Sequence, residues 1–295
     1  MWNPKSHGSS PNASCARSLG SCATWKMAAK SRSCQIDPMR IMLTNDDGID
    51  APGLRALLSV LERHGEVTVI APADGQSATS HSLSFSRPLL TSEQEIPGHG
   101  KHLAVAGRPA DCTRLGLRNL FAARTGADQP DLVVSGMNAG ANAGVNVAYS
   151  GTVAAAMEAA FHGVPAIAVS LMTGGGPPNF VRAAEIADTW LPDLIAQAKA
   201  GTVLNLNLPR VHTDDTPVMP LSVCRVNRSV HDSRYERRDT PWGEDYYWIL
   251  GSGISFREVE PGSDVEALNA GRASLSPLRW DPVCDDSIDA LSGAF

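Results

Sequence analysis

The stretch "RIMLTNDDGIDAPGLRALLSVLERHGEVTVIAP", residues 40–72, contains the pattern that decides the fold. It begins with a short apolar run at residues 40–44, which has the composition and length of a buried strand. Pro52 then opens a segment with leucines on one helical face, and Gly65 ends it. A second strand-like run follows at residues 66–72. A strand, a helix and a strand within about thirty residues predict a right-handed βαβ unit.

The same alternation continues along the chain as far as Pro209. Further apolar runs predict strands at residues 131–136, 164–172 and 202–209. Helical segments are predicted at residues 109–123, 152–163 and 180–201, the last interrupted by Pro192. Residues 77–107, which Pro and Gly punctuate, predict short strands or a hairpin. Apolar strands that alternate with helices are typical of an α/β fold with a doubly wound, mostly parallel sheet.

Three segments are distinguished by composition. Residues 1–38 are rich in Ser and carry no acidic residue before Asp37, so we expect a disordered extension or a misassigned start upstream of Met39. A transit peptide fits this segment less well, and without an apolar h-region a secretory signal is disfavoured. Residues 39–210 form the predicted α/β core. Residues 211–295 lose the alternation and gather aromatic side chains, which predicts β-rich C-terminal arms.

Bulk properties exclude several classes of function. With 43% hydrophobic and 19% charged residues, the 295-residue chain has the composition of a soluble globular protein. The net charge of −6 provides no basic field for duplex nucleic acid or anionic lipid. No apolar stretch approaches the ~20 residues that span a bilayer. The six cysteines include no C-x-x-C pair, which favours free thiols in a reducing, cytoplasmic compartment.

Polar segments follow three of the predicted strands, at residues 45–48, 71–82 and 135–146. The carboxyl ends of parallel strands meet at one edge of a sheet, so these segments should lie together. Their candidate ligand atoms are all oxygens, which favour Mg²⁺ or Mn²⁺ over zinc. They belong to Asp46, Asp47, Ser77 or a neighbouring Ser or Thr, and Asn138 or Asn142. The alternative is a helix-capping Asp beside a solvated turn Asp.

The third polar segment also predicts an anion site. Ser150, Gly151 and Thr152 lead directly into a helix, where unpaired N–H groups attract phosphate. The alternative is that the small residues serve tight helix packing. A divalent ion beside a phosphate site indicates phosphoryl chemistry with a metal-activated water. A dinucleotide-binding oxidoreductase is disfavoured because G-x-G-x-x-G is absent after the first strand, and an aspartyl phosphatase because Asn45 replaces the nucleophile.

Four segments closely resemble the stationary-phase survival protein SurE family: "MRIMLTNDDGIDAPG" (39–53), "VIAPADGQSATSHSLS" (69–84), "DLVVSGMNAGANAG" (131–144) and "YSGTVAAAMEAAFHGVPAIAVS" (149–170). The likeness extends from Met39 to near Asp281. It implies a metal-dependent nucleotidase of nucleoside monophosphates with a Rossmann-like α/β domain. It also implies C-terminal arms that are exchanged between the subunits of a homodimer or homotetramer.

The resemblance implies one divalent ion per subunit, Mg²⁺ or Mn²⁺, held by Asp46, Asp47, Ser77 and Asn138. The predicted catalytic residues are Asp46, Asp47 and Asn142. The predicted substrate- and phosphate-binding residues are Asn45, Gly140, Ser150, Gly151 and Thr152. The predicted reaction is the hydrolysis of nucleoside monophosphates to nucleoside and phosphate by a metal-activated water. A non-catalytic nucleotide- or phosphate-binding protein on the same fold is the alternative.

Some positions depart from the family pattern or keep two interpretations. Ala78 stands where members often have Gly, which predicts an altered loop, and Ser263, Arg272 and Ala273 alter a C-terminal motif. For His81 two interpretations remain open: a side chain near the substrate, or a loop histidine whose hydrogen bonds are made to water. Residues 234–238 meet anionic substrate across a subunit boundary or form a solvated or interface face, the second interpretation being favoured. For the aromatic residues we favour packing of the arm on the core over base stacking: Trp242, Tyr246, Tyr247 and Trp248.

Overall fold

The structure is a computed structural model that describes residues 38–250, 255–281, 283 and 285–292. The predictions for the N-terminal extension concern residues that lie outside this part, apart from Pro38. The strands are β1 (Arg40–Thr44), β2 (Glu66–Pro72), β3 (Thr91–Ile96), β4 (Gly100–Val105), β5 (Leu132–Ala139), β6 (Ala166–Leu171), β7 (Val203–Leu208), β8 (Leu221–Val223), β9 (Arg234–Asp239), β10 (Asp245–Leu250) and β11 (Ala273–Leu278). The helices are α1 (Pro52–Leu61), α2 (Pro109–Leu115), α3 (Phe121–Thr125), α4 (Gly151–Phe161), α5 (Phe180–Asp188), α6 (Leu191–Gln197), α7 (Asp264–Asn269) and α8 (Asp285–Ser292), with the π-helix η1 (Gly116–Leu120) and the 3₁₀-helix η2 (Gly144–Ala148).

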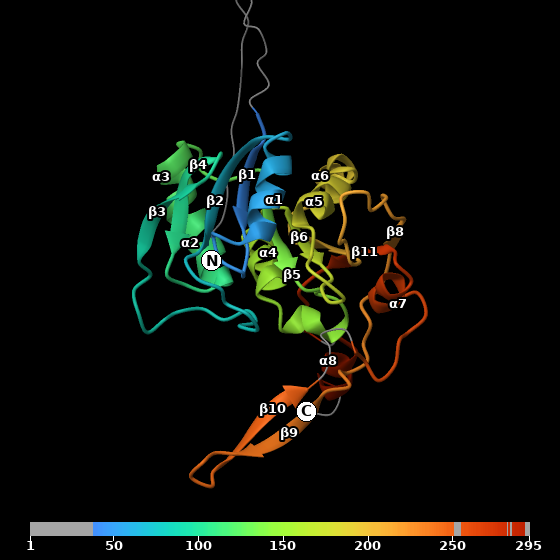
Figure 1. Cartoon of the computed structure of the whole chain (residues 1–295). Coiled ribbons are helices and arrows are strands. Elements are labelled where there is room, and N and C mark those ends of the chain that lie inside the picture. Colours follow the sequence, from blue (N-terminus) through green and yellow to red (C-terminus); the bar gives the residue numbers. More distant parts are fainter. Residues whose placement is uncertain (1–37, 251–254, 282, 284, 293–295) are drawn as a thin grey trace, which may run out of the picture. The chain divides into compact units, whose positions relative to one another are not determined.

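A nine-stranded sheet forms the centre of the described fold, in the order β3-β4-β2-β1-β5-β6-β7-β11-β8 (Figure 1). Within this order, every adjacent pair between β4 and β7 is parallel. The chain winds outward in one direction from β1 through β2 and in the other from β5 through β7. This reversal between β1 and β5 is where open α/β sheets bind their ligands. The predicted doubly wound, Rossmann-like α/β class is confirmed.

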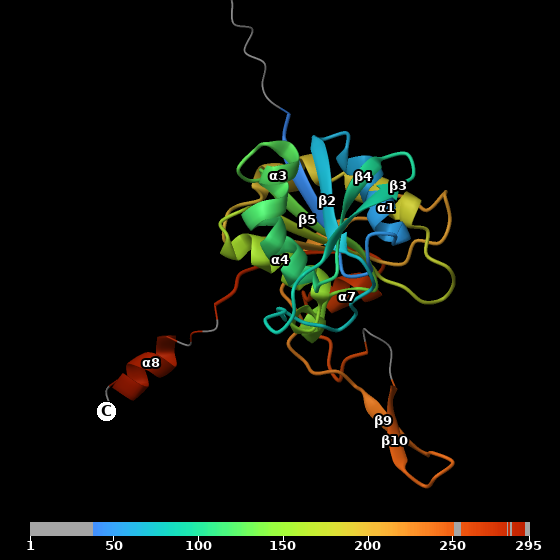
Figure 2. The same cartoon turned by 90° about the vertical axis from the view of Figure 1, so that its left-hand side faces the viewer.

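Helices cover both faces of the sheet because the strands carry apolar side chains on both. On one face α1, α5 and α6 pack on a cluster that includes Leu43, Leu57 and Val169. On the other, α2 and α4 lie side by side over a cluster that includes Met42 and Val153 (Figure 2). In α1 the residues Leu54, Leu57, Leu58 and Leu61 are fully buried, as the helical spacing of the leucines predicts.

Several predicted elements differ in detail from those of the structure. The helix predicted at residues 180–201 is divided into α5 and α6, and Pro192 lies in the first turn of α6, where it needs no backbone N–H. The helix predicted at residues 109–123 is a run of α2, η1 and α3. The irregular section contains the hairpin of β3 and β4, which adds an antiparallel edge to the sheet.

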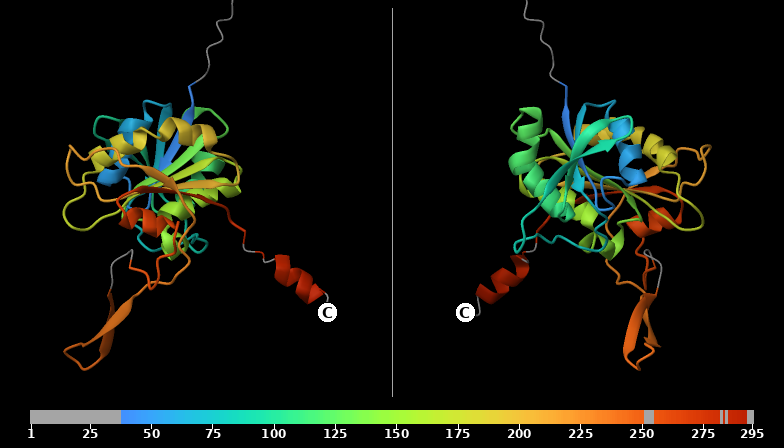
Figure 3. Two further views of the ribbon diagram at one scale, coloured as in Figure 1. Left: turned by 90° about the vertical axis from the view of Figure 1, so that its right-hand side faces the viewer. Right: turned by 60° about the vertical axis from the view of Figure 1, so that its left-hand side comes forward.

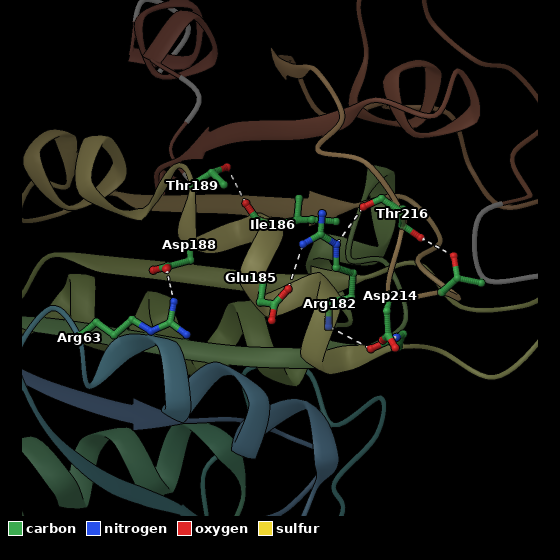
Figure 4. A network of polar contacts seen from close by, with 10 residues as sticks. Arg63, Arg182, Glu185, Ile186, Asp188, Thr189, Asp214 and Thr216 are labelled. Carbon is green, nitrogen blue, oxygen red and sulfur yellow. Dashed lines mark hydrogen bonds and ion pairs between the residues drawn. The ribbon is translucent and has the colours of Figure 1, made fainter.

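The helix α5 is held to its surroundings by polar contacts at the surface (Figure 4). The Arg63 guanidinium, just after α1, forms an ion pair of 2.8 Å with Asp188 at the end of α5. Arg182 donates from Nε to the Thr216 carbonyl (2.9 Å) and pairs with Glu185 (2.9 Å), which lies on the same helix. These contacts tie α5 to α1 and to the segment that follows β7.

The C-terminal segment is only partly an arm. Its strand β11 pairs antiparallel with β7 and parallel with β8, so both belong to the central sheet. The helix α7 also contacts the polar rim, because Asp264 accepts a hydrogen bond of 2.9 Å from the Gly144 N–H. Neither contact follows from the sequence pattern, because both join residues that are far apart along the chain.

The remaining hairpin, β9 and β10, forms a separate antiparallel pair (Figure 3). Its aromatic side chains do not pack on the core of this chain as expected, since Tyr247 and Trp248 are each 58% exposed and Trp242 is 85% exposed. Residues 234–238 lie on β9, where most of the side chains are also exposed. A search of the described helices for one that is long and apolar enough to cross a bilayer finds none.

Candidate active site

The turn after β1 carries the two adjacent carboxylates. Asn45 closes it, because its Nδ2 donates to the Gly48 carbonyl at 2.8 Å. Asp46 follows with only 6% of its surface exposed, whereas Asp47 is partly exposed. Both residues therefore lie at the carboxyl end of β1, beside the reversal of the sheet.

Hydrogen bonds bring the other two polar segments to this turn. The Gln76 N–H donates to the Asp46 carbonyl at 2.7 Å, which places Ser77 beside the carboxylates. The Ala139 N–H at the end of β5 donates to the Asp47 carboxylate at 2.9 Å. The pairing of β5 with β6 shifts register between Ser135 and Asn138, an irregularity of the kind that re-aims a side chain.

The three segments line a cavity of about 220 Å³ that is open to solvent. Its walls bring together the four side chains predicted as metal ligands and the predicted catalytic Asn142. The lining residues are Asp46, Asp47, Ser77, Ala78, Asn138, Ala139, Asn142, Asn146, Tyr149 and Ser150. The predicted meeting of polar loops at one rim is therefore observed in the geometry.

The N-terminus of α4 is directed at Asp46. Ser150 caps the helix, since its hydroxyl accepts from the Val153 N–H at 3.0 Å. Thr152 donates to the Asp46 carboxylate from both its hydroxyl and its backbone N–H. Gly151 permits this approach, because a Cβ there would lie 2.8 Å from that of Asp46. The positive end of the helix dipole therefore lies against the carboxylate pair.

The surroundings of the two carboxyls disfavour two negative charges in the protein alone. Burial of the Asp46 carboxyl raises its pKa from 3.8 to about 6, the hydrogen bond from Thr152 opposes the shift, and the negative charge of Asp47 adds to it. Burial also raises the pKa of Asp47, against the hydrogen bond from Ala139. Two neighbouring carboxyls that resist ionisation are stabilised in their charged form by a cation.

The donor set fits a hard divalent cation. Two carboxylates, the Ser77 hydroxyl and the Asn138 amide provide oxygen ligands, which Mg²⁺ and Mn²⁺ prefer. Asn138 donates from Nδ2 to the Gly140 carbonyl at 2.7 Å, so its Oδ1 remains for the cavity. Groups of three or more His, Cys, Asp or Glu that suit a metal ion are absent from the described residues.

The predicted phosphate-binding residues occupy different places. Ser150 lines the cavity, whereas Gly151 and Thr152 pack against Asp46 behind its wall. The Gly140 N–H is bonded to the Leu171 carbonyl at 2.8 Å and faces the sheet. Asn45 is fully buried in its turn. Both residues have structural contacts here, and their roles in phosphate binding stay predictions.

Sequence reasoning did not find Asn146 and Tyr149, or place Ala78 in the wall of the site. These three residues also line a larger hollow of about 640 Å³ between the third loop and the hairpin segment. The signals available were the position of Tyr149 next to Ser150 and the replacement of Gly by Ala78. Neither pattern shows that these residues line the same cavity, because their proximity depends on how separate loops fold together.

His81 has a defined partner. Its Nε2 lies 2.8 Å from Glu158, a carboxylate of α4 that also approaches His162 (3.3 Å) and Arg114 (3.7 Å). Burial favours the neutral form of Glu158, but the hydrogen bond and charge of His81 and the charges of Arg114 and His162 hold its pKa below its usual 4.5. His81 therefore ties the Ser77 loop to α4 and is not a group in the wall of the small cavity.

Comparison with known proteins places this arrangement in a family. The sequence profile described as survival protein SurE matches residues 41–233, well over half of the chain. The chain belongs to the SurE family. Its relatives include proteins named 5'-nucleotidase SurE from Rhodopirellula baltica, 42% identical over 86% of this chain and 97% of that protein, and from Moorella thermoacetica, 40% identical over 82% and 91%. The crystal structure of the SurE protein from Aquifex aeolicus superposes with a TM-score of 0.72 at 31% identity, covering 86% of this chain and 99% of that one.

Proposed function

We propose that this SurE-family chain is a divalent-metal-dependent 5'-nucleotidase that hydrolyses nucleoside monophosphates to nucleoside and phosphate. The observation that carries the proposal is the meeting of Asp46, Asp47, Ser77 and Asn138 around one cavity at the N-terminus of α4. The name 5'-nucleotidase SurE, given to relatives with about 40% identity over most of the chain, supplies the substrate class.

One Mg²⁺ or Mn²⁺ ion per subunit would be held by Asp46, Asp47, Ser77 and Asn138. When bound, it would supply Lewis-acid polarisation of the phosphoryl group and activation of the attacking water. Thr152 holds the Asp46 carboxylate in place through two donors. The Ala139 N–H does the same for Asp47. With both ligands fixed by backbone and helix, the site is ordered before substrate arrives.

The chain's own groups would orient the phosphoryl group. The Asn142 side chain and Ser150 lie in the cavity wall, where they can bond phosphoryl oxygens. The dipole of α4 favours negative charge at the same place. Water attack at phosphorus would break the bond to the nucleoside oxygen, which leaves with a proton as a hydroxyl while phosphate is released.

Phosphate release from a panel of nucleoside monophosphates tests the proposal. We expect turnover with Mn²⁺ or Mg²⁺ and none in excess EDTA, with activity restored when metal is added back. Nucleotide binding without phosphate release in either metal would refute the enzymatic function and favour the non-catalytic binding protein. Full turnover in EDTA would refute the dependence on a divalent metal.

We also propose that the chain acts as a homodimer or homotetramer through its C-terminal hairpin. The apolar side chains Trp248, Ile249 and Leu250 of β10 are between 45% and 63% exposed in the single chain, an arrangement that a partner surface would cover. A cytoplasmic location is proposed from the thiols, since Cys112 and Cys224 are free within the described part of the chain.

A further inference from the structure

The strand β7 carries two asparagines where a buried strand is expected to be apolar. Leu204, Leu206 and Leu208 point to the cluster under α1 and α5, so Asn205 and Asn207 point to the opposite face. Both asparagines are fully buried. Asparagine is depleted in strands, and a buried amide is costly unless its groups are hydrogen-bonded. The partners of these two side chains therefore indicate why they are present.

Both side chains bond the main chain of Asn142. The Asn142 N–H donates to Asn207 Oδ1 at 2.7 Å. Its carbonyl accepts from Asn205 Nδ2 at 2.9 Å and from Asn207 Nδ2 at 3.3 Å. The N–H and the carbonyl of this loop residue are thus both held by one strand inside the sheet.

A third contact fixes the side chain of the same residue. Asn142 Nδ2 donates to the hydroxyl of Ser170 on β6 at 2.9 Å. Ser170 is fully buried and lies opposite Asn207 in the register of β6 and β7. Asn142 keeps its Oδ1 and a second N–H for the cavity that it lines.

We propose that Ser170, Asn205 and Asn207 form a clamp that positions Asn142 for the reaction. This inference rests on the proposed function, in which Asn142 contacts the phosphoryl group. The three residues are positioning residues, since none of them lines the small cavity. The clamp matters because a displacement of about 1 Å in a group that touches the reacting centre can cost on the order of 100-fold in rate.

The variant Ser170→Ala tests the side-chain contact with little change in volume. Its matched control is Ser274→Ala, which removes a fully buried hydroxyl from β11, also opposite Asn207 but with no bond to Asn142. We expect Ser170→Ala to lower kcat about tenfold with little change in KM, because contacts that orient a site residue are worth this much. Ser274→Ala should keep the kcat of the wild type.

A double-mutant cycle separates positioning from general loosening of the fold. If Ser170 acts through Asn142, then Ser170→Ala should cause no further loss of kcat in a chain that already carries Asn142→Ala. A second tenfold loss in that background, wild-type kcat for Ser170→Ala, or wild-type kcat for Asn142→Ala would each overturn the proposal.

Hydrogen exchange provides a measurement that does not depend on turnover. In Asn207→Ala the Asn142 N–H loses its acceptor, so its exchange should accelerate while that of β1 stays unchanged. Unchanged exchange at Asn142 would overturn the clamp. If Asn207→Ala fails to fold, the same measurement on Asn205→Ala decides, because the Asn142 carbonyl then loses the shorter of its two donors and keeps only Asn207 Nδ2 at 3.3 Å. Wild-type protein that releases no phosphate would overturn the proposed function instead, and exchange at Asn142 would still decide the clamp.

Discussion

At the scale of single residues, the Asp46 carboxyl sets how the metal-free protein responds to pH. Its pKa is about 6 when folded and 3.8 as an ordinary aspartate, so between these values the folded state binds more protons than the unfolded chain. The contribution of Asp46 to stability should therefore fall by about 3 kcal/mol as pH rises through this window and stay level above it. Urea unfolding in EDTA at pH 4, 5, 6 and 7 measures this slope, which Asp46→Asn should largely remove.

Replacing either carboxylate should separate chemistry from stability. Asp46→Asn and Asp47→Asn remove a charged ligand and should abolish most phosphate release, while the metal-free melting temperature stays level or rises as repulsion is relieved. Asp50→Asn is the control, since Asp50 lies in the same loop outside the cavity and pairs with Arg55 at the surface. If the carboxylates were merely helix caps, their loss would cost ~1 kcal/mol and leave turnover intact.

Ala78 has a backbone conformation that suits glycine. Its φ of 56° lies in the left-handed region, which costs an L-residue roughly 1–2 kcal/mol. Ala78→Gly should therefore raise the free energy of unfolding by up to about 1 kcal/mol, after the greater freedom of glycine in the unfolded chain is subtracted. Ala148→Gly, in the facing loop and without a positive φ, should instead lower it. Equal destabilisation by both variants in urea titrations would contradict the assignment of strain.

Residue patterns predicted the meeting of the polar loops better than the contacts that support them. Strand ends bring loops together wherever a parallel sheet forms, which placed Asp46, Asp47, Ser77 or a neighbour, and Asn138 or Asn142 at one rim. The set of four metal ligands stays a prediction that the family resemblance implies. The supports depend on distances between elements: Asn207 reaches Asn142 across the sheet, and Thr152 reaches Asp46 across the reversal of the strand order. A signal for the first was present, since two polar residues alternate with leucines in β7.

At the scale of elements, α4 supports the site through contacts at both of its ends. Its first turn holds Asp46, and Glu158 near its far end holds His81 of the loop that carries Ser77. Glu158→Gln should destabilise the protein at about pH 7 by 1–3 kcal/mol, because a buried charge network loses its carboxylate. It should also raise the Mn²⁺ concentration needed for turnover, since the Ser77 loop is less firmly held.

The pH dependence of this variant provides a check. The pKa of Glu158 lies below its usual 4.5, so its contribution is complete above that pH and is lost as pH falls through the lowered value. The deficit of Glu158→Gln in urea unfolding should therefore shrink at acid pH. Glu185→Gln is the control, because its ion pair with Arg182 is at the surface and contributes less than about 1 kcal/mol (Figure 4). Equal deficits for both variants would contradict a role for the Glu158 network.

At the scale of the whole molecule, the hairpin of β9 and β10 should mediate self-association. Replacing Tyr247 and Trp248 by Ser should shift the protein toward monomer. The small polar serines would contribute little free energy of association, because they bury little apolar surface against a partner. Phe85→Ser is the control, since Phe85 is 87% exposed on a different loop and should leave the assembly unchanged. Light scattering over a concentration series measures the molecular mass. A wild-type protein that is monomeric at every concentration would refute self-association through the hairpin.

The alternation of strands and helices predicted the parallel sheet, because helices join consecutive strands such as β1 and β2 or β6 and β7 that also lie side by side. It could not predict that β11 returns to the sheet from the far end of the sequence, or that α7 contacts Gly144. A short strand such as β11, in which serines alternate with apolar residues, has the same pattern whether it belongs to an arm or to a sheet. Only its pairing with β7 assigns β11 to the sheet, and no local sequence pattern indicates which strand will be the partner.

The late return of β11 has a consequence for the nascent chain. A ribosome delivers β1 through β7 in order, and these strands can pair as they emerge, but the partner of β7 arrives only after residues 209–272 have been made. Until then the backbone of β7 is an unpaired edge, open to another copy of the chain. Translation speed over residues 209–272 thus sets how long each newborn molecule is exposed to misassembly.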